Sequence, residues 1–377
     1  MKEYIQRGSW NDRAFNSINK LIANHGKDNP SYTPEKKPFA VFDWDNTSII
    51  GDVEEATLYY LITNLAFKIN PEELYEIIRV HVDRSDFRDP YRNLEGERVN
   101  IDKISADIYE VYKKLYGTSD RLGGDVPFEM IKETDAYKEF VAKMIFRYKA
   151  ADHDKEAEDS YCWMAFLFTH YEPEEIEKFC EEAFAFMKNE EVRREKFISP
   201  NIETQAGRVA VSYFVGLGNI PEMVDLYHTL EQEGIDVYVV SASFIDIVRA
   251  FATGNSYNFP KEKVLGLRLT KDKRGKVIPE LDKAYPMTQK EGKSDTIRKL
   301  IHNEANYGPI LVGGDSDGDL SMMTEFPTTD LGLIIDRRVK GEINNLKQEA
   351  LAGSERYILQ ARNPYEKTFI RDETSIN

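Results

Sequence analysis

The sequence predicts an α/β fold, a doubly wound parallel sheet interrupted by a long helical insertion. Short apolar runs at residues 39–42, 237–240 and 310–312 are typical of buried parallel strands, and helical patterns lie between the later runs. The span from Asp52 to about Pro200 has helical periodicity almost throughout, with no series of parallel strands. We therefore expect residues 1–50 and 205–377 to form the core and residues 51–204 to form an inserted helical domain.

The first half of the chain contains clear helix signals. A helix is expected over residues 11–24, because Phe15, Ile18 and Ile22 recur on one stripe. Within the insertion, Pro-Glu-Glu occurs at residues 71–73 and 173–175, a pattern typical of a helix start.

The strand and helix alternation returns near residue 220. The last forty or so residues are expected to form a surface helix and a tail. Between these points we expect a helix over 221–233, strands at 237–240, 310–312 and 331–335, a short β excursion at 264–269 and 276–278, and a helix from Glu291.

Charge narrows the choice of partners. The 377 residues include 50 Lys and Arg against 66 Asp and Glu, which gives a formal net charge of −16. Such a chain repels phosphate backbones and anionic membranes, so we expect neither a nucleic-acid partner nor a membrane partner. A small cationic ligand, or a phosphate bridged by a metal ion, suits this charge better.

No segment of the sequence predicts a membrane span or an export signal. No stretch approaches the roughly 18 apolar residues of a membrane helix, and the first residues lack an apolar signal core. The expected location is the cytoplasm, with an extracytoplasmic location after removal of a signal peptide left open.

The cysteines and histidines predict no zinc site. Cys162 and Cys180 lie in helical patterns without CxxC spacing and are expected to be buried thiols, and there is no HExxH pattern.

Three of the expected strands end in polar clusters. Asp43 and Asp45 follow the first strand, Ser241 ends the second, and the segment 315–319 (Asp-Ser-Asp-Gly-Asp) follows the third. Taken alone, Asp43 and Asp45 fit an ordinary turn as well as a site. In a parallel sheet, however, all three ends lie at one edge, where α/β proteins bind ligands.

Carboxylates gathered at one edge require a cation. Hard divalent ions with oxygen ligands fit best, and Mg²⁺ is the expected ion because it is commonly held by one or two carboxylates together with substrate phosphate. A calcium loop at 315–319 does not fit, because the sixth and twelfth positions are Leu320 and Phe326 instead of Gly and Glu.

The whole pattern resembles the haloacid dehalogenase superfamily of phosphohydrolases. That signature is an Asp-x-Asp-x-Thr loop, a strand ending in Ser or Thr, a lysine, and a Gly-Asp cluster that ends in Asp. All four parts occur here in the family's order, as Asp43-Trp-Asp-Asn-Thr47, Ser241, Lys293, and Gly314-Asp315 with Asp319. The insertion after the first motif is similar to the cap domain of the phosphoserine phosphatase branch. The resemblance implies a Rossmann-like core with an inserted cap.

The resemblance also implies catalytic and phosphate-binding roles. Asp43 would attack phosphorus and form an aspartyl-phosphate, and Asp45 would act as acid and then as base. Ser241 and Lys293 would bind the phosphate oxygens, and the remaining loop residues Asn46 and Thr47 are assigned to the same phosphate-binding set.

For the metal, the resemblance implies a Mg²⁺ site. The Asp43 and Asp315 carboxylates and the Asp45 backbone carbonyl would hold the ion, and Asp319 would bind the metal or its water. Asp317 stays open between that role and shaping of its loop.

The likeness extends to bacterial phosphorylcholine phosphatases. Glu54 and Glu55 resemble the acidic pair that follows their first motif, the Asp-x-Asp-Asn-Thr-Ser form matches as well, and Glu291 would lie near the choline site. A trimethylammonium group is held by carboxylate charge and aromatic faces. Candidate cage walls are Trp44, Tyr59, Tyr60, Tyr161 and Trp163, each of which fits a helix core equally.

Three alternatives stay open or are disfavoured. The first is a phosphatase for phosphoserine or another amino-alcohol phosphate. Phosphoserine phosphatases need in addition an arginine for the substrate carboxylate, for which the candidates are Arg79, Arg84, Arg88 and Arg92. A catalytically dead choline- or metal-binding protein is disfavoured because every catalytic position is filled. A dehalogenase is disfavoured because that chemistry does not need the carboxylates at 315–319.

Overall fold

A parallel sheet forms the centre of the protein. The computed structural model describes residues 2–152, 162–254, 256–301, 308–372 and 375–376. Within them a seven-stranded sheet has the order β13-β12-β11-β10-β1-β6-β7. All neighbouring strands pair in parallel except β13, which runs antiparallel to β12. These strands are β1 (Phe39–Phe42), β6 (Asp236–Phe244), β7 (Val264–Leu267), β10 (Leu311–Gly314), β11 (Leu331–Ile335), β12 (Tyr357–Asn363) and β13 (Thr368–Ile370).

Helices cover both faces of this sheet, which confirms the predicted fold class. Every residue of the four-residue β1 is buried, and its side chains alternate between two apolar clusters. Ala40 and Phe42 join a cluster with residues of α1 (Asp12–His25) and α9 (Pro221–Gln232). Phe39 and Val41 join a second cluster. Its helical members come from α12 (Leu320–Thr324) and α13 (Ile343–Leu351).

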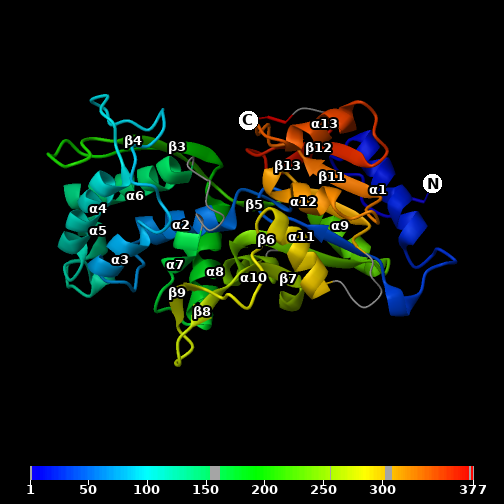
Figure 1. The fold of residues 1–377 in the computed structure, drawn as a ribbon, viewed down its shortest axis with the longest axis horizontal. Coiled ribbons are helices and arrows are strands. Elements are labelled where there is room, and N and C mark those ends of the chain that lie inside the picture. The colour runs from blue at the N-terminus through cyan, green and yellow to red at the C-terminus, as the bar shows by residue number, and fades with distance from the viewer. Residues whose placement is uncertain (1, 153–161, 255, 302–307, 373–374, 377) are drawn as a thin grey trace.

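The predicted insertion contains a series of helices, and many of them form a lobe beside the sheet (Figure 1). They are α2 (Val53–Thr63), α3 (Pro71–Ile77), α4 (Ile101–Leu115), α5 (Phe128–Ile131), α6 (Asp135–Asp152), α7 (Cys162–Phe166) and α8 (Pro173–Asn189).

The insertion also includes a strand that the helical prediction missed. β3 (Arg193–Ile198) pairs antiparallel with β4 (Ala210–Val215), so this pairing spans the predicted boundary at residue 204. β3 begins with four charged residues, Arg-Arg-Glu-Lys, so the sequence shows no apolar and polar alternation. In the structure, half-buried and exposed side chains do alternate along this strand. The division of the chain into core and cap stays a prediction.

The two connections to the insertion lie side by side. β2 (Ile49–Ile50) pairs antiparallel with β5 (Gly218–Asn219). Gly51 follows with φ +89°, and a Cβ there would meet the carbonyl oxygen of Gly216 at 2.8 Å. Only glycine fits this approach, and α2 begins two residues later at the edge of the sheet.

Two sequence expectations were wrong. Residues 264–267 do not belong to a separate β excursion, because β7 pairs in parallel with β6 in the main sheet, whereas β8 (Leu269–Lys271) and β9 (Val277–Leu281) do form their own pair. The last forty residues include the buried strand β12 as well as surface segments. Gln360 within β12 is fully buried and donates to the Ile370 carbonyl. Because this polar residue interrupts the apolar run, the sequence pattern did not predict a strand there.

The other local expectations are confirmed. The helices expected at residues 11–24 and 221–233 are α1 and α9, and Pro71 and Pro173 begin α3 and α8. Cys162 and Cys180 are buried free thiols. In the described part of the chain, no helix combines the length and the apolar character needed to cross a membrane.

A buried ionic cluster holds part of the insertion together. The Nζ atom of Lys143 in α6 lies 2.6 Å from Asp107 Oδ2 in α4, and it also pairs with Glu139. Lys143 is completely buried, and Asp107 accepts the backbone N–H groups of Gln205 and Ala206 from the β3–β4 connection. One lysine therefore pairs with two buried carboxylates, and the cluster links three segments.

Replacing this lysine is expected to destabilise the insertion strongly. Lys143→Met leaves Asp107 and Glu139 buried without a cation, so we expect a loss of about 3–5 kcal/mol of unfolding free energy. The matched control is Lys138→Met on the same helix, whose side chain is 48% exposed and should contribute about 0–1 kcal/mol. Thermal or urea unfolding measures both, and equal effects would contradict the assigned role of Lys143.

Candidate active site

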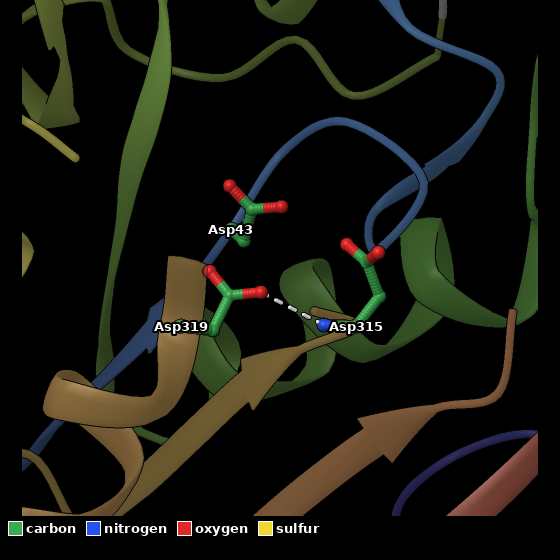
Figure 2. Close-up of side chains that lie close together, drawn as sticks. All are labelled: Asp43, Asp315 and Asp319. Carbon is green, nitrogen blue, oxygen red and sulfur yellow. Dashed lines mark hydrogen bonds between the residues drawn. The ribbon is translucent and has the colours of Figure 1, made fainter. Parts of the chain in front are cut away.

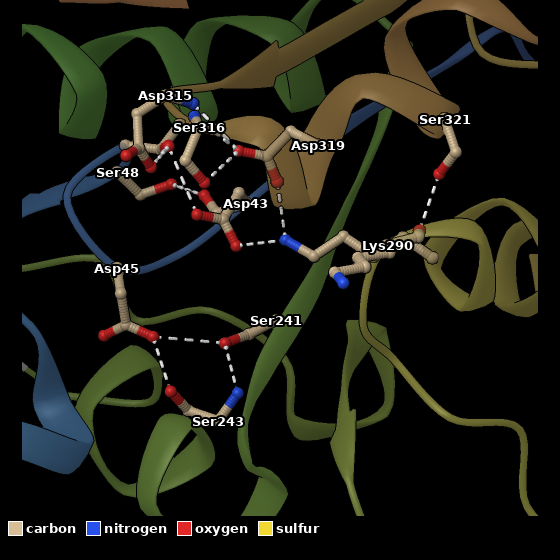
Figure 3. A network of polar contacts seen from close by, with 12 residues as sticks. Asp43, Asp45, Ser48, Ser241, Ser243, Lys290, Asp315, Ser316, Asp319 and Ser321 are labelled. Carbon is tan, nitrogen blue, oxygen red and sulfur yellow. Dashed lines mark hydrogen bonds and ion pairs between the residues drawn. The ribbon is translucent and has the colours of Figure 1, made fainter. Parts of the chain in front are cut away.

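The carboxyl ends of three neighbouring strands bring the predicted residues together. β1 lies between β10 and β6, so Asp43 after β1, Asp315 after β10 and Ser241 in β6 meet at one edge. Lys293 reaches the same place from α11 (Glu291–Thr296). Figure 3 shows two groups of polar contacts at this edge, one around Asp43, Asp315 and Asp319 and a separate one of Asp45, Ser241 and Ser243.

Three carboxylates form a compact buried triad (Figure 2). One oxygen atom from each of Asp43, Asp315 and Asp319 lies within 4.8 Å of the other two, and all three residues are buried. The hydroxyl of Thr47 donates to Asp315 Oδ1 at 2.9 Å and lies 3.3 Å from Asp43 Oδ2. Thr47 therefore orders the first loop against the third.

Lys293 pairs with two members of the triad. Its Nζ atom lies 2.5 Å from Asp43 Oδ1 and 2.7 Å from Asp319 Oδ1, in surroundings that leave the residue 2% exposed. Burial opposes the charged amine, but the charges of Asp319 and Asp43 raise the pKa of Lys293 above its ordinary value. The amine therefore stays protonated beside the carboxylates.

Asp319 and Asp317 have different environments although they lie in one turn. Asp319 Oδ2 accepts the backbone N–H groups of Asp315 at 2.9 Å and Ser316 at 3.1 Å, which fixes its other oxygen toward Lys293. Asp317 Oδ1 instead accepts the N–H of Ile343 at the start of α13. This contact gives Asp317 the loop-shaping role that the sequence left open.

Asp45 stands apart from the triad. Its Oδ2 accepts hydrogen bonds from Ser243 at 2.8 Å and Ser241 at 3.2 Å, and its Oδ1 accepts the N–H of Val53 at 2.7 Å (Figure 3). Burial, with the nearby charge of Asp43, raises the pKa of Asp45 to about 7. A carboxyl group with this pKa can carry a proton in one step and accept it in another near neutral pH.

The donor set fits a hard divalent cation. The triad offers only carboxylate oxygens, and burial raises the pKa of Asp43, with the charges of Asp319 and Asp315 adding to the rise while Lys293 opposes it. Gathering these carboxylates in their ionised forms therefore needs more positive charge than Lys293 supplies. Magnesium-type coordination by oxygen ligands meets that need.

Two arginines and a serine at this edge were missed in the sequence. Arg337, just beyond β11, lies 2.9 Å from Asp315 Oδ2, and Arg362 in β12 donates to the backbone and side-chain oxygens of Asn46 at 3.2–3.3 Å. Ser243 lies two residues beyond Ser241 on one strand, so the shared face was a usable signal. Arg337 follows the predicted strand at residues 331–335, so it could have been found as a polar residue at the carboxyl end of a parallel strand. Arg362 lies in a strand that was not predicted.

The loop residue Asn46 therefore already accepts hydrogen bonds from another side chain of the protein. It has a φ of 61°, a left-handed conformation that asparagine tolerates, and Arg362 binds both of its oxygens. Asn46 lies at the site, but its side-chain oxygen holds an arginine in the described structure.

The two glutamates that follow the first motif have unlike surroundings. Glu55 accepts from Lys149 at 2.9 Å and also from Tyr148. Burial works against its ionised form, but Lys149 and Tyr148 lower the pKa of Glu55 below its usual value. Glu55 is thus neutralised within the protein.

Glu54, by contrast, has no cationic partner among the described residues. It is 5% exposed, it accepts the backbone N–H of Phe244, and its Oε1 has no hydrogen-bond partner there. Burial raises its pKa well above the usual value, and the charges of Asp52 and Asp45 add to the rise. An unpaired buried carboxyl beside Asp45 is a candidate binding group for a cation.

The tryptophan rings are occupied by other side chains. Trp44 is fully buried, with ring centroids 5.0 Å from Tyr257 and 5.9 Å from Phe251. The Arg147 guanidinium lies 3.7 Å from the ring centroid of Trp163. Core packing accounts for the first ring, and one face of the second already carries a cation.

The remaining substrate candidates lie elsewhere or outside the described residues. Tyr59 stacks on Tyr213 with centroids 5.9 Å apart, and Tyr60 packs against Phe179. Glu291 is exposed on α11 and lines a surface pocket, while Lys293 on the same helix turns into the site. Tyr161 lies outside the described residues.

Comparison with protein families gives a match to part of the chain. The family model for haloacid dehalogenase-like hydrolases matches residues 134–324, about half of the chain. This range includes Ser241, Lys293, Asp315 and Asp319 and begins after the first motif. The comparison with curated proteins found no match.

Solved structures include one very similar protein. A conserved functionally unknown protein from Anaerococcus prevotii is 55% identical, with a TM-score of 0.97 over 100% of this chain and 99% of that chain. A phosphoserine phosphohydrolase-like protein from Francisella tularensis is 14% identical, with a TM-score of 0.36 over 82% of this chain and 92% of that chain. A substrate-bound phosphoserine phosphatase is 11% identical, with a TM-score of 0.36 over 90% of this chain and 95% of that chain.

The family match carries the assignment, and the buried arrangement of Asp43, Lys293, Asp315 and Asp319 agrees with it. This chain belongs to the haloacid dehalogenase-like hydrolases.

Proposed function

We propose that this protein is a Mg²⁺-dependent phosphomonoester hydrolase that works through an aspartyl-phosphate on Asp43. One observation carries the proposal. Two carboxyl groups in different surroundings, those of Asp43 and Asp45, lie at the same edge of the sheet. Asp43 belongs to the triad that Lys293 neutralises in part, whereas Asp45 lies apart with a pKa raised to about 7. A nucleophile and a separate proton carrier are what this reaction requires.

In the first step, an oxygen of Asp43 attacks phosphorus as the bond between phosphorus and the ester oxygen breaks. Lys293, 2.5 Å from Asp43 Oδ1, favours the ionised carboxylate and holds it in place, and a bound metal ion would add the remaining positive charge. The protonated Asp45 gives its proton to the leaving alcohol oxygen, which leaves Asp45 as a carboxylate.

In the second step, Asp45 accepts a proton from a water molecule that attacks the aspartyl-phosphate. The bond between phosphorus and the Asp43 oxygen breaks, inorganic phosphate leaves, and Asp43 returns as a carboxylate. The hydrogen bonds from Ser243 and Ser241 keep the Asp45 carboxyl oriented for both transfers.

The metal would be held by the side chains of Asp43, Asp315 and Asp319, with the Asp45 backbone carbonyl as a further ligand. When bound, Mg²⁺ supplies positive charge that compensates the phosphoryl oxygens and the carboxylates around them.

For the alcohol part of the substrate, we propose a cationic group such as choline. Glu54 supports this choice, because it is buried, unpaired and close to Asp45, which protonates the leaving oxygen. Binding of a trimethylammonium group would favour the ionised form of Glu54, so cation binding and proton release are linked. The likeness of Glu54 and its neighbours to phosphorylcholine phosphatases supports the same substrate.

The phosphoserine alternative needs an arginine for the substrate carboxylate. Arg79 and Arg84 pair with Asp102, and Arg92 pairs with Asp89. Three of the four candidate arginines therefore have acidic partners within the protein.

Removing the nucleophile or the metal should abolish turnover. Asp43→Asn is expected to lower kcat for p-nitrophenyl phosphate about a thousandfold or more, because the amide cannot form the acyl phosphate. Excess chelator should have a comparable effect that added Mg²⁺ reverses. Retained activity in either experiment would contradict the mechanism, and phosphorylcholine binding without any turnover in the wild type would favour a non-enzymatic protein.

The pH profile should depend on the leaving group. Asp45 must be protonated to assist an alkyl alcohol, and its pKa is about 7, so kcat for phosphorylcholine should fall as pH rises above about 7. p-Nitrophenolate leaves without a proton, so its rate should fall less over that range. In single-turnover measurements of alcohol release, Asp45→Asn should slow the alkyl ester far more than the aryl ester, because only the first step depends on the leaving group. Identical pH profiles for both substrates would exclude Asp45 as the acid.

Glu54 and Glu55 should differ as substrate determinants. Glu54→Gln is expected to raise KM for phosphorylcholine at least about tenfold, the typical scale of one charged contact, with little change in KM for p-nitrophenyl phosphate. Glu55→Gln is the matched control, since Lys149 already neutralises that side chain. Equal effects of Glu54→Gln on both substrates, or a lower KM for phosphoserine than for phosphorylcholine in the wild type, would remove the cationic-substrate proposal.

A further inference from the structure

We propose that Arg337 is a positioning residue that acts as the counter-ion of Asp315 in the metal-free protein and thereby weakens metal binding. This inference rests on the proposed function, because it takes Asp43, Asp315 and Asp319 as the metal site.

The geometry gives Arg337 a place equivalent to that of Lys293. Lys293 pairs with Asp43 and Asp319, and Arg337 pairs with the third carboxylate, its Nη1 lying 2.9 Å from Asp315 Oδ2. The other oxygen of Asp315 accepts the Thr47 hydroxyl. Every carboxylate of the triad therefore contacts a cation of the protein, although two cations serve three carboxylates.

Arg337 also faces carboxylates outside the triad. Its charge interacts favourably with Asp315, with Glu55 and with Asp52, the N-cap of α2. Arg362, which donates to Asn46, lies near enough to Arg337 that the two guanidinium groups repel each other. The carboxylates at the start of α2 therefore attract Arg337, whereas Arg362 repels it.

These charges determine whether Arg337 strengthens or weakens metal binding. In the metal-free state Arg337 stabilises a carboxylate that is only 1% exposed, and losing a partner would leave that charge buried and unpaired. In the loaded state the same guanidinium repels the divalent ion across Asp315. Arg337 therefore stabilises the free protein more than the loaded protein, so its removal favours metal binding.

Titration calorimetry of the full chain with Mg²⁺, repeated with Mn²⁺, tests the proposal. Arg337→Met should bind the ion about tenfold more tightly than the wild type, given one repulsive charge at close range. Its metal-free thermal midpoint should fall, and the rise in that midpoint on adding metal should be larger than in the wild type. Arg337→Lys keeps the charge and should restore affinity toward the wild-type value.

Two further variants complete the test. Arg338→Met removes a positive charge from the adjacent exposed side chain and should leave affinity unchanged. Arg337→Gln removes the charge but keeps a hydrogen-bond donor for Asp315, so it decides the question if the Met variant does not fold.

Metal affinity in the neutral variants that equals or falls below that of the wild type would overturn the role of Arg337 and leave the proposed function standing. Failure of the proposed metal site has a different signature, in which wild type and Asp315→Asn show the same metal binding.

Discussion

The constraint on which the rest of this structure depends is the confinement of several carboxylates at the end of a buried strand pair. β1 and β10 are buried, and the loops that follow them place Asp43, Asp315 and Asp319 within reach of one another. Like charges in such surroundings cannot all ionise without compensation. The surrounding elements supply it, with Lys293 from α11, Arg337 from beyond β11, and the Asp315 and Ser316 N–H groups donated to Asp319.

The insertion takes part in this arrangement directly. The first helical N–H of α2, from Val53, donates to Asp45, and the paired strands β2 and β5 fix where that helix begins. Burial and the charge of Asp43 raise the pKa of Asp45, while the N–H of Val53 from the insertion and the hydroxyls of Ser243 and Ser241 from β6 act in the opposite direction. Because Val53 belongs to α2, the placement of that helix and the environment of Asp45 are physically linked.

The adjacent residues Glu54 and Glu55 on α2 lie in different electrostatic surroundings. Successive helix residues point about 100° apart, so Glu54 turns toward Phe244 and the site, while Glu55 turns toward Lys149 and Tyr148. Glu55 is paired within the protein, whereas Glu54 is buried without a cationic partner in the described structure. An acidic pair in the sequence thus becomes a single candidate binding group.

The sequence by itself determined the α/β class, most helix starts and the polar residues at the strand ends, Asp43, Asp45, Ser241 and Asp315, because each follows from a local switch between apolar and polar residues. The resemblance to a known family added Lys293. Tertiary structure decided whatever depends on partners distant in the chain. Arg337 pairs with Asp315, Lys149 neutralises Glu55, and Trp44 packs against Tyr257, although the members of these pairs lie 22, 94 and about 213 residues apart. Neither composition nor periodicity encodes such contacts, because the free energy of a buried charge or ring depends on neighbours that only the folded chain brings together.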